Sequence, residues 1–337
     1  MNIYDISKKA GVSIATVSRV LNGSDKVSET TRQKVLDVIR ETNYTPNAFA
    51  RSLGLNSMST VGILCSDASD VYQAQAVCYL ERELRGNSYV SMLCCTGYRL
   101  EEKRSYLQLL LSRSVDALIL IGSHFVESDP KSNDYIRNAA QKVPVFILNG
   151  LLEAPHVYSV LCDDRRASCA VTDLILSRGS RLPLYLYRAL SYSGRKKIQG
   201  FGDACAAHGL QPEQKRVFAA PGGIRETCQV LARIRQSGLP FDAVVAADDE
   251  LAAGAVKYAL QEGLSIPEDF QVAGYNRSVL AACSTPEITT VDNRIEYMCV
   301  TAVSLLMQIF RGETPPSMTM YSASLVEGKT TRPDNRR

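Results

Sequence analysis

The chain has 337 residues, of which 45% are hydrophobic and 22% are charged, and its formal net charge is +3. This length exceeds that of a single typical domain, and the apolar share can bury large cores. No basic and apolar leader opens the sequence, and no run of 18 apolar residues occurs in it. We therefore expect a cytoplasmic protein that neither is secreted nor contacts a membrane.

Residues 3–22 predict two short amphipathic helices separated by a tight turn. Apolar residues recur at i, i+3 and i+7 in the first helix and at i, i+3 and i+4 in the second, so the two stripes can face each other. Gly11 permits the turn, and Ser13 can cap the second helix. This spacing is typical of a helix-turn-helix, whose second helix enters a DNA major groove. A helical hairpin with a solvated polar face is the alternative that this pattern alone leaves open.

The outward side chains of the second helix are suited to reading bases. They are Ile14, Ala15, Thr16, Ser18, Arg19 and Asn22. Arginine can donate two bonds to guanine, and isoleucine or alanine can contact a thymine methyl. Residues 1–60 hold eight Lys or Arg and five acidic residues, a net charge of +3. The whole chain also has a net charge of +3, so the charges of the remaining residues cancel. The excess positive charge thus lies where phosphate contacts need it.

A third helix is predicted from Glu29 to Thr42, with Ser28 as its cap, and a short helix-capable run follows Pro46. At this point the chain closely resembles the LacI/GalR family of bacterial transcription regulators. The resemblance rests on AGVSIATVSRVLNG (10–23), KVSETTRQKVLDVIRETNYTPN (26–47) and ARSL (50–53). It is nearly continuous over about the first 55 residues.

The resemblance implies a DNA-binding head over residues 1–58 that ends in a hinge helix at about 46–54. In that family the hinge helix enters the minor groove of a pseudo-palindromic operator, and its leucine, here Leu53, wedges into a base step. The resemblance places Ile14, Ala15 and Arg19 on base edges and gives Thr16, Ser18 and Asn22 backbone-positioning roles. It also assigns Asn47 and Ala50 to the DNA-contacting residues.

From residue 60 onward, short apolar runs alternate with amphipathic stretches, which predicts doubly wound α/β units with parallel sheets. The predicted strands are 61–65, 90–94, 117–121, 145–148, 184–187, 243–246 and 271–274, and the predicted helices include 77–84, 106–111, 170–176 and 251–260. The fold class is therefore an all-α head followed by an α/β core.

For that core, the resemblance implies a periplasmic-binding-protein-like effector-binding and dimerisation unit over residues 59–328. Three crossovers, near 159–164, 286–293 and 314–321, would join two parallel-sheet lobes. We assign about 59–160 and 288–317 to the first lobe and about 161–287 and 318–328 to the second. The tail, 329–337, is expected to be disordered.

Ligands of open α/β sheets bind beyond the carboxyl ends of the strands. In sugar-binding members of the family, an aromatic ring packs on the sugar, and carboxylates, amides and an arginine hold its hydroxyls. The candidate effector-binding residues here are Tyr72, Gln73, Ser123, Asp163, Lys197, Asp248, Asn276 and Asn293. Asp248 replaces the family's usual asparagine and Asn276 its usual aspartate, which either preserves hydroxyl recognition or marks a different effector. Capping of helices and packing of lobes is the alternative role for these residues.

The sequence lacks the motifs that metal binding or dinucleotide binding would need. The ten cysteines contain no Cys-x-x-Cys pair and are expected to be reduced core thiols, and the three histidines have no ligand spacing, so no metal or cofactor is expected. Gly200-Phe-Gly202 lacks the third glycine of a dinucleotide fingerprint. The acid pairs Asp163-Asp164 and Asp248-Asp249 each follow a strand, where neighbouring side chains point apart, so one carboxylate can cap a helix or contact a ligand.

The sequence therefore predicts a homodimeric repressor of carbohydrate uptake or catabolism genes, and not an enzyme. Its partners would be double-stranded operator DNA and a small, sugar-like effector held between the lobes. A global or non-sugar regulator, controlled by a protein partner, a nucleobase or no ligand, is the alternative within transcription. A solute-binding protein with a vestigial head and an enzyme on the α/β core are the rivals from other classes.

Overall fold

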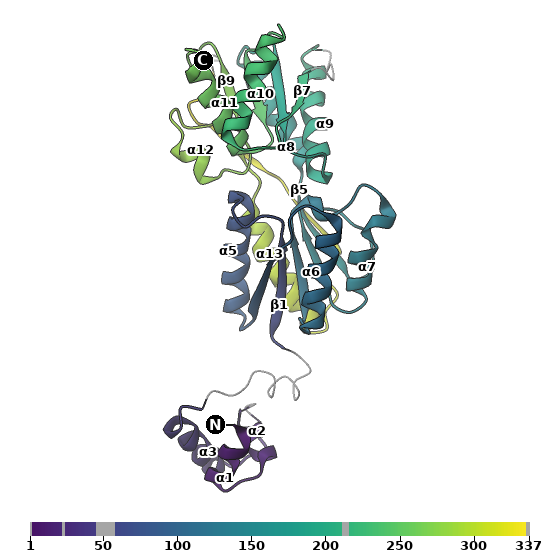
Figure 1. Ribbon diagram of the computed structural model, residues 1–337, viewed down its shortest axis with the longest axis vertical. Helices are drawn as coiled ribbons and strands as arrows, with labels where there is room; N and C mark the ends of the chain where they lie inside the picture. Colours follow the sequence, from purple (N-terminus) through teal and green to yellow (C-terminus); the bar gives the residue numbers. More distant parts are fainter. Residues whose placement is uncertain (1, 22–23, 45–57, 211–215, 335–337) are drawn as a thin grey trace. The chain divides into compact units, whose positions relative to one another are not determined.

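The computed structural model describes residues 2–21, 24–44, 58–210 and 216–334 (Figure 1). These residues form two compact units. The first, which we call the head, contains the N-terminal 60 residues together with 114–116, and the second, which we call the core, contains the remainder. None of the described helices is long and apolar enough to cross a membrane.

The head contains the three predicted helices: α1 (Ile3–Ala10), α2 (Ile14–Leu21) and α3 (Glu29–Glu41). Ser28 caps α3 through a bond from the Thr31 amide, as expected. The apolar stripes of the three helices meet in a small core, whose buried members are Ile6, Ala10, Val17, Val20, Val35 and Tyr44. The helix-turn-helix predicted from residue spacing is therefore confirmed.

The first lobe of the core is a six-stranded sheet with the order β11-β5-β4-β3-β1-β2. Its strands are β1 (Thr60–Cys65), β2 (Val90–Cys95), β3 (Ala117–Ile121), β4 (Val145–Leu148), β5 (Val157–Cys162) and β11 (Met318–Tyr321). Its helices are α5 (Val71–Gly86), α6 (Leu100–Ser112), α7 (Asp134–Ala140) and α13 (Ile295–Phe310), with 3-10 turns η1 (Ser123–Phe125) and η2 (Pro130–Asn133). Helices α5 and α13 cover one face, and α6 and α7 cover the other (Figure 1).

The second lobe is a parallel sheet with the order β7-β6-β8-β9. Its strands are β6 (Pro183–Tyr187), β7 (Val217–Ala219), β8 (Ala243–Ala246) and β9 (Gln271–Ala273). Its helices are α8 (Asp164–Ser177), α9 (Tyr192–Ala207), α10 (Ile224–Gln236), α11 (Asp249–Gln261) and α12 (Val279–Cys283). Helices α8 and α9 pack on one face and α10 and α11 on the other. An antiparallel pair, β10 (Thr290–Asp292) and β12 (Ser324–Val326), completes the core.

Three sequence-based assignments were wrong in detail. Residues 157–162, which are absent from the predicted strands, form β5 inside the first sheet, where the polar Ser159 is nevertheless buried, and the chain then enters α8 of the second lobe within the expected crossover at 159–164. Residues 318–321, assigned to the second lobe, form β11 and pair with β5 in the first lobe. The tail is ordered as far as residue 334, because Thr330 is fully buried and exchanges backbone and side-chain bonds with Val272.

Candidate DNA-reading surface and effector site

The turn between α1 and α2 is built by the two residues that the sequence singles out. Gly11 ends α1 with φ +60, a left-handed conformation that glycine adopts without a steric penalty. The Ser13 hydroxyl accepts a bond from the Thr16 amide at 3.1 Å and so caps the start of α2. Asn2 and Asp5 form a reciprocal capping box at the start of α1. Local capping therefore fixes the angle at which α2 leaves the turn.

The outward face of α2 carries the predicted DNA-reading side chains. Ile14 is 38% exposed, Ala15 and Arg19 are also exposed, and Thr16 and Ser18 are half-buried. The Arg19 guanidinium has no hydrogen-bond or ion-pair partner among the described residues, whereas the Thr16 hydroxyl bonds that of Ser13 at 2.9 Å. The predicted residues Asn22, Asn47, Ala50 and Leu53 lie outside the described part of the chain.

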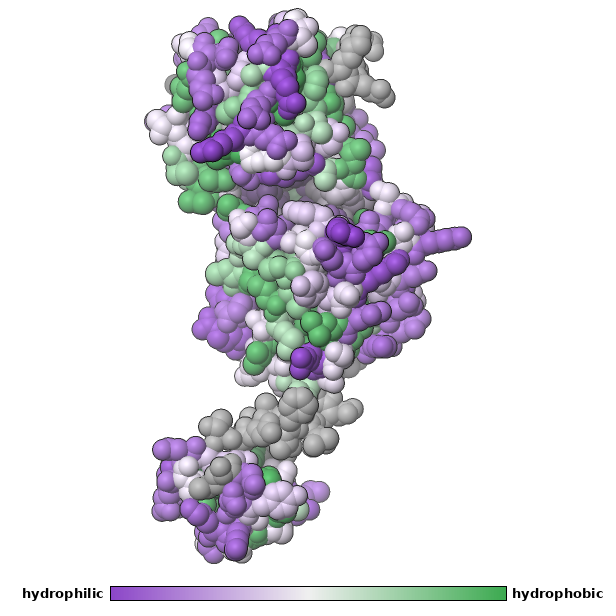
Figure 2. All heavy atoms as spheres, in the orientation of Figure 1, coloured by the Kyte–Doolittle hydropathy of each residue, from purple (hydrophilic) through white to green (hydrophobic). Residues whose placement is uncertain are grey.

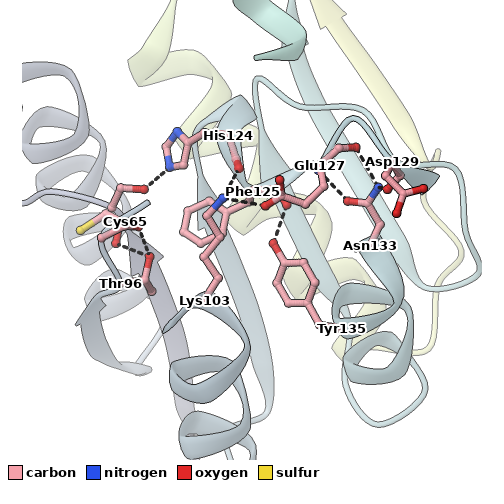
Figure 3. Close-up of polar contacts among 11 residues, drawn as sticks. Cys65, Thr96, Lys103, His124, Phe125, Glu127, Asp129, Asn133 and Tyr135 are labelled. Carbon is pink, nitrogen blue, oxygen red and sulfur yellow. Dashed lines mark hydrogen bonds and ion pairs between the residues drawn. The ribbon is translucent and has the colours of Figure 1, made fainter. Parts of the chain in front are cut away.

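In the first lobe, a network of polar side chains lies at the carboxyl ends of β1 and β3 (Figure 3). The His124 imidazole bonds the Ser66 hydroxyl, and the buried Lys103 ammonium donates to the His124 carbonyl at 2.6 Å and to Glu127 at 2.8 Å. The Tyr135 hydroxyl donates to the Phe125 carbonyl at 2.5 Å. Burial, followed by the nearby Lys103 charge, lowers the pKa of His124 from 6.5 to about 3, so the ring is neutral at ordinary pH.

Hydrogen bonds also join the two lobes directly. Ser123, in η1, donates to the hydroxyl of Ser191, which caps α9, at 2.8 Å. Arg195 of α9 donates to Ser128 at 3.0 Å. Ser123, a predicted effector residue, thus lies at a contact between the lobes.

Asp164 is the buried centre of the crossover after β5. Its carboxylate accepts bonds from Tyr275 at 2.7 Å and from Asn149 at 3.1 Å. Burial raises the pKa of Asp164, although the neighbouring Lys197 charge opposes the shift. Lys197 lies over the Tyr275 ring at 3.6 Å and donates to the Ala247 carbonyl at 2.9 Å. Lys197 is therefore held inside the second lobe.

Asp248 caps α11 and is also part of a charged triad. Its carboxylate accepts from the Leu251 amide at 2.9 Å and from the Arg188 Nε at 2.5 Å. Arg188 also bonds Glu250, and although burial opposes the charged guanidinium, these two carboxylates raise its pKa. The next residue, Asp249, accepts bonds from Ser278 and Thr290, and burial raises its pKa to about 6.

The remaining predicted effector residues differ in how fully they are bonded. Asp163 caps α8. The side-chain oxygen of Gln73 accepts a hydrogen bond from the Ser66 backbone amide at 2.7 Å. Asn293 donates to the Asn276 side chain at 3.0 Å. The Asn293 Oδ1 atom and the Tyr72 hydroxyl are buried without a partner among the described residues. These two atoms are the unsatisfied polar groups in the predicted set.

Sequence reasoning missed Arg188 and Glu250, and it gave His124 no role of its own. Arg188 directly follows β6, so the rule that selected Asp248 could have found it. A groove of about 440 Å³ lies elsewhere on the second lobe, and Asp163 alone among the predicted effector residues lines it, together with Arg165, Arg166, Cys169, Ala170, Asp173 and Asp203. The described residues contain no group of three or more His, Cys, Asp or Glu that could hold a metal.

The ten cysteines were expected to be core thiols, and this was correct only in part. All are free, and four of them are buried: Cys65, Cys162, Cys205 and Cys299. Cys78, Cys95 and Cys283 are exposed, which contradicts the expectation for these three. For Cys95 the reason is that strand β2 lies at the sheet edge and leaves four of its six residues exposed, which the apolar pattern of the strand does not show.

Comparison with known proteins agrees with the geometry. Residues 2–47 match bacterial regulatory proteins of the lacI family, and residues 172–331 match the periplasmic binding protein-like domain. An HTH-type transcriptional regulator of Lachnoclostridium phytofermentans is 48% identical over 331 residues, which cover 98% of this chain and 99% of the relative.

Two solved structures share the fold at 24% identity, and each match covers 98% of this chain and 99% of the other. The lac repressor dimer bound to operator and the anti-inducer ONPF has a TM-score of 0.89, and the transcriptional regulator CelR-cellobiose complex has 0.72. A helix-turn-helix head on a two-lobed α/β core defines a DNA-binding transcriptional regulator, and its relatives are regulators and not enzymes. The chain belongs to the lacI family of bacterial regulatory proteins.

Proposed function

We propose that the protein is a homodimeric repressor of carbohydrate uptake or catabolism genes, controlled by a small sugar-like effector between its lobes. One observation carries the DNA-reading part of this proposal: α2 presents Arg19, Ile14 and Ala15 outward, and their side chains are not part of the apolar core formed by the described residues of the head. Direct readout of a major groove needs such a donor beside small apolar groups. A protein that reads operator DNA shares the compartment of the chromosome, so we place it in the cytoplasm.

Effector control is supported by the bonds that join the lobes. The Ser123–Ser191 and Arg195–Ser128 contacts depend on how the lobes face each other, so a ligand that changes this orientation breaks or forms them. A ligand shifts an equilibrium only through its different affinities for the two states. The unsatisfied Tyr72 hydroxyl and Asn293 Oδ1 are polar groups that a hydroxyl-rich ligand could bond. CelR, a structure of the same fold, is described as a cellobiose complex.

The proposed homodimer is supported by an apolar edge of the first lobe. Strand β2 lies at the end of its sheet, and its Val90, Met92 and Leu93 are 66%, 36% and 42% exposed. Figure 2 shows apolar residues gathered on this lobe between α5 and α6. A second copy is our proposed cover for this edge, because unpaired apolar edge strands otherwise invite unspecific association. Two heads would then read the two halves of a pseudo-palindrome.

The DNA-reading proposal is tested by selecting binding sites from a random duplex library with the full chain. We expect a pseudo-palindrome to be enriched. On that site Arg19→Ala should weaken binding by about 1–3 kcal/mol, roughly 5- to 150-fold, and much less on random duplex. Lys8→Ala, the matched control at the exposed end of α1, should weaken binding to both DNAs alike if Lys8 contacts phosphate. Equal losses on both DNAs for Arg19→Ala would contradict its role as a base reader.

The effector proposal is tested by thermal-shift measurements with sugars, sugar phosphates and nucleobases. A ligand at 100 times its Kd should stabilise the folded core by about 2.7 kcal/mol. A sugar that raises Tm and also changes operator affinity would support the proposal. A nucleobase with both effects, or operator binding that no compound in the set alters, would favour the non-sugar alternative.

A further inference from the structure

Two cysteines meet at the carboxyl ends of neighbouring strands in the first lobe. The Sγ atoms of Cys65, the last residue of β1, and Cys95, the last residue of β2, are 3.6 Å apart. The Thr96 amide donates to the Cys65 carbonyl at 2.9 Å, which holds the two strand ends in place. Sulfur atoms on adjacent strands need only a small shift to reach bonding distance, because the strand spacing lies within the Cα separations of disulfides.

The two thiols differ in access to solvent. Cys65 is fully buried, and burial, followed by its contact with Cys95, raises its pKa to about 12. Cys95 is exposed. A reactant from solvent therefore meets Cys95 first, and Cys65 lies directly behind it as the group that can resolve the product.

We propose that Cys65 and Cys95 are a thiol pair that a small organic disulfide, such as oxidised glutathione, converts into an intrachain disulfide between β1 and β2. The Cys95 thiolate attacks one sulfur of the reagent, forms a mixed disulfide and releases one thiolate. The Cys65 thiol then attacks the Cys95 sulfur, and its proton passes to the second reagent thiolate as that group leaves. The two cysteines are oxidised, and one reagent disulfide is reduced to two thiols.

The proposed disulfide would lie next to the hydrogen-bonded network at the end of β1. Ser66 directly follows Cys65 and bonds both His124 and the Gln73 side chain. A bond between β1 and β2 therefore fixes the segment that leads into this network.

The experiment uses the full chain with Cys78→Ser and Cys94→Ser. Tryptic peptide 52–82 contains Cys65 and Cys78, and peptide 86–99 contains Cys94 and Cys95, so these two changes leave one thiol in each peptide. The reduced protein is incubated with oxidised glutathione, unreacted thiols are alkylated, and the digest is analysed by mass spectrometry without reductant. We expect the two peptides to be joined, with two hydrogens lost, and to separate on mild reduction.

Adding Cys95→Ser should abolish the joined species. Exposed Cys283, on α12, is the control within the same sample and should take up glutathione without a bridge to either peptide. Retention of glutathione on Cys95 with Cys65 still alkylated after denaturation would overturn the proposal. A bond between the Cys95 residues of two chains, which a non-reducing gel detects as a covalent dimer, would overturn it as well. Neither outcome depends on DNA or effector binding, so the proposed function is tested separately.

Discussion

The two lobes of the core share one architecture but complete their strand ends with different chemistry. In the first lobe the first polar side chains after β1 to β4 are uncharged: Ser66, Thr96, Ser123 and Asn149. In the second lobe Arg188 follows β6, and Asp248 and Asp249 follow β8. The parallel sheet determines where a site lies, while the side chains at each strand end determine how that lobe responds to charge and pH.

This contrast predicts that acid changes the stability of the two lobes in opposite directions. The largest expected change concerns His124 in the first lobe. Unfolding restores its ordinary pKa near 6.5, whereas the folded ring has a pKa of about 3. The unfolded chain therefore binds more protons, and this group's contribution to stability falls by roughly 3–5 kcal/mol as pH drops from 6.5 toward 3. NMR titration of the imidazole should show a neutral ring down to at least pH 4.

His124→Gln sharpens this prediction, because glutamine keeps a polar contact with Ser66 but cannot titrate. Urea unfolding at a series of pH values should show the wild-type advantage over the variant shrinking as the solution is acidified. A ring that titrates near pH 6.5 in the folded protein would contradict the burial argument.

The second prediction has the opposite sign and concerns Asp249 in the second lobe. Burial raises its pKa from 3.8 to about 6, so the folded protein binds more protons between these values. Its contribution to stability should therefore decline by about 2–3 kcal/mol as pH rises from 4 to 6 and stay constant above that. Asp249→Asn should remove this decline in urea unfolding, while the His124-dependent change remains. A decline that survives the substitution would assign it to another group.

The head was predictable in more detail than the core, for a physical reason. Helix caps, turn residues and apolar spacing are local, so Gly11, Ser13 and Ser28 define the head from sequence alone. The core depends on pairing between distant segments: β11 joins β5 across more than 150 residues, and Thr330 completes the edge of β9. The strand-end rule found Asp248 and could also have found Arg188, but the bond between them could not be predicted, because it exists only after the lobe has folded.

The third prediction concerns Asp248, a charged side chain at a strand end of the second lobe. If Asp248 contacts an effector, Asp248→Ala should abolish effector control while leaving the DNA affinity without effector nearly unchanged. The structure predicts in addition a loss of stability of about 1–2 kcal/mol, because alanine removes both the cap of α11 and one of the two carboxylates that pair with Arg188. Thermal unfolding should show this as a Tm lowered by a few degrees.

Two conservative variants separate the two roles of Asp248. Asparagine is an equally good cap without the charge, so Asp248→Asn should retain most of the stability that alanine loses. Glu250→Gln removes the other carboxylate that bonds Arg188 and leaves the cap intact, and it should lower Tm least, because the pair is partly solvent-exposed. If Asp248→Asn and Asp248→Ala were equally destabilised, the ion pair and not the cap would be the main contribution of Asp248. Charge would then dominate this strand end of the second lobe.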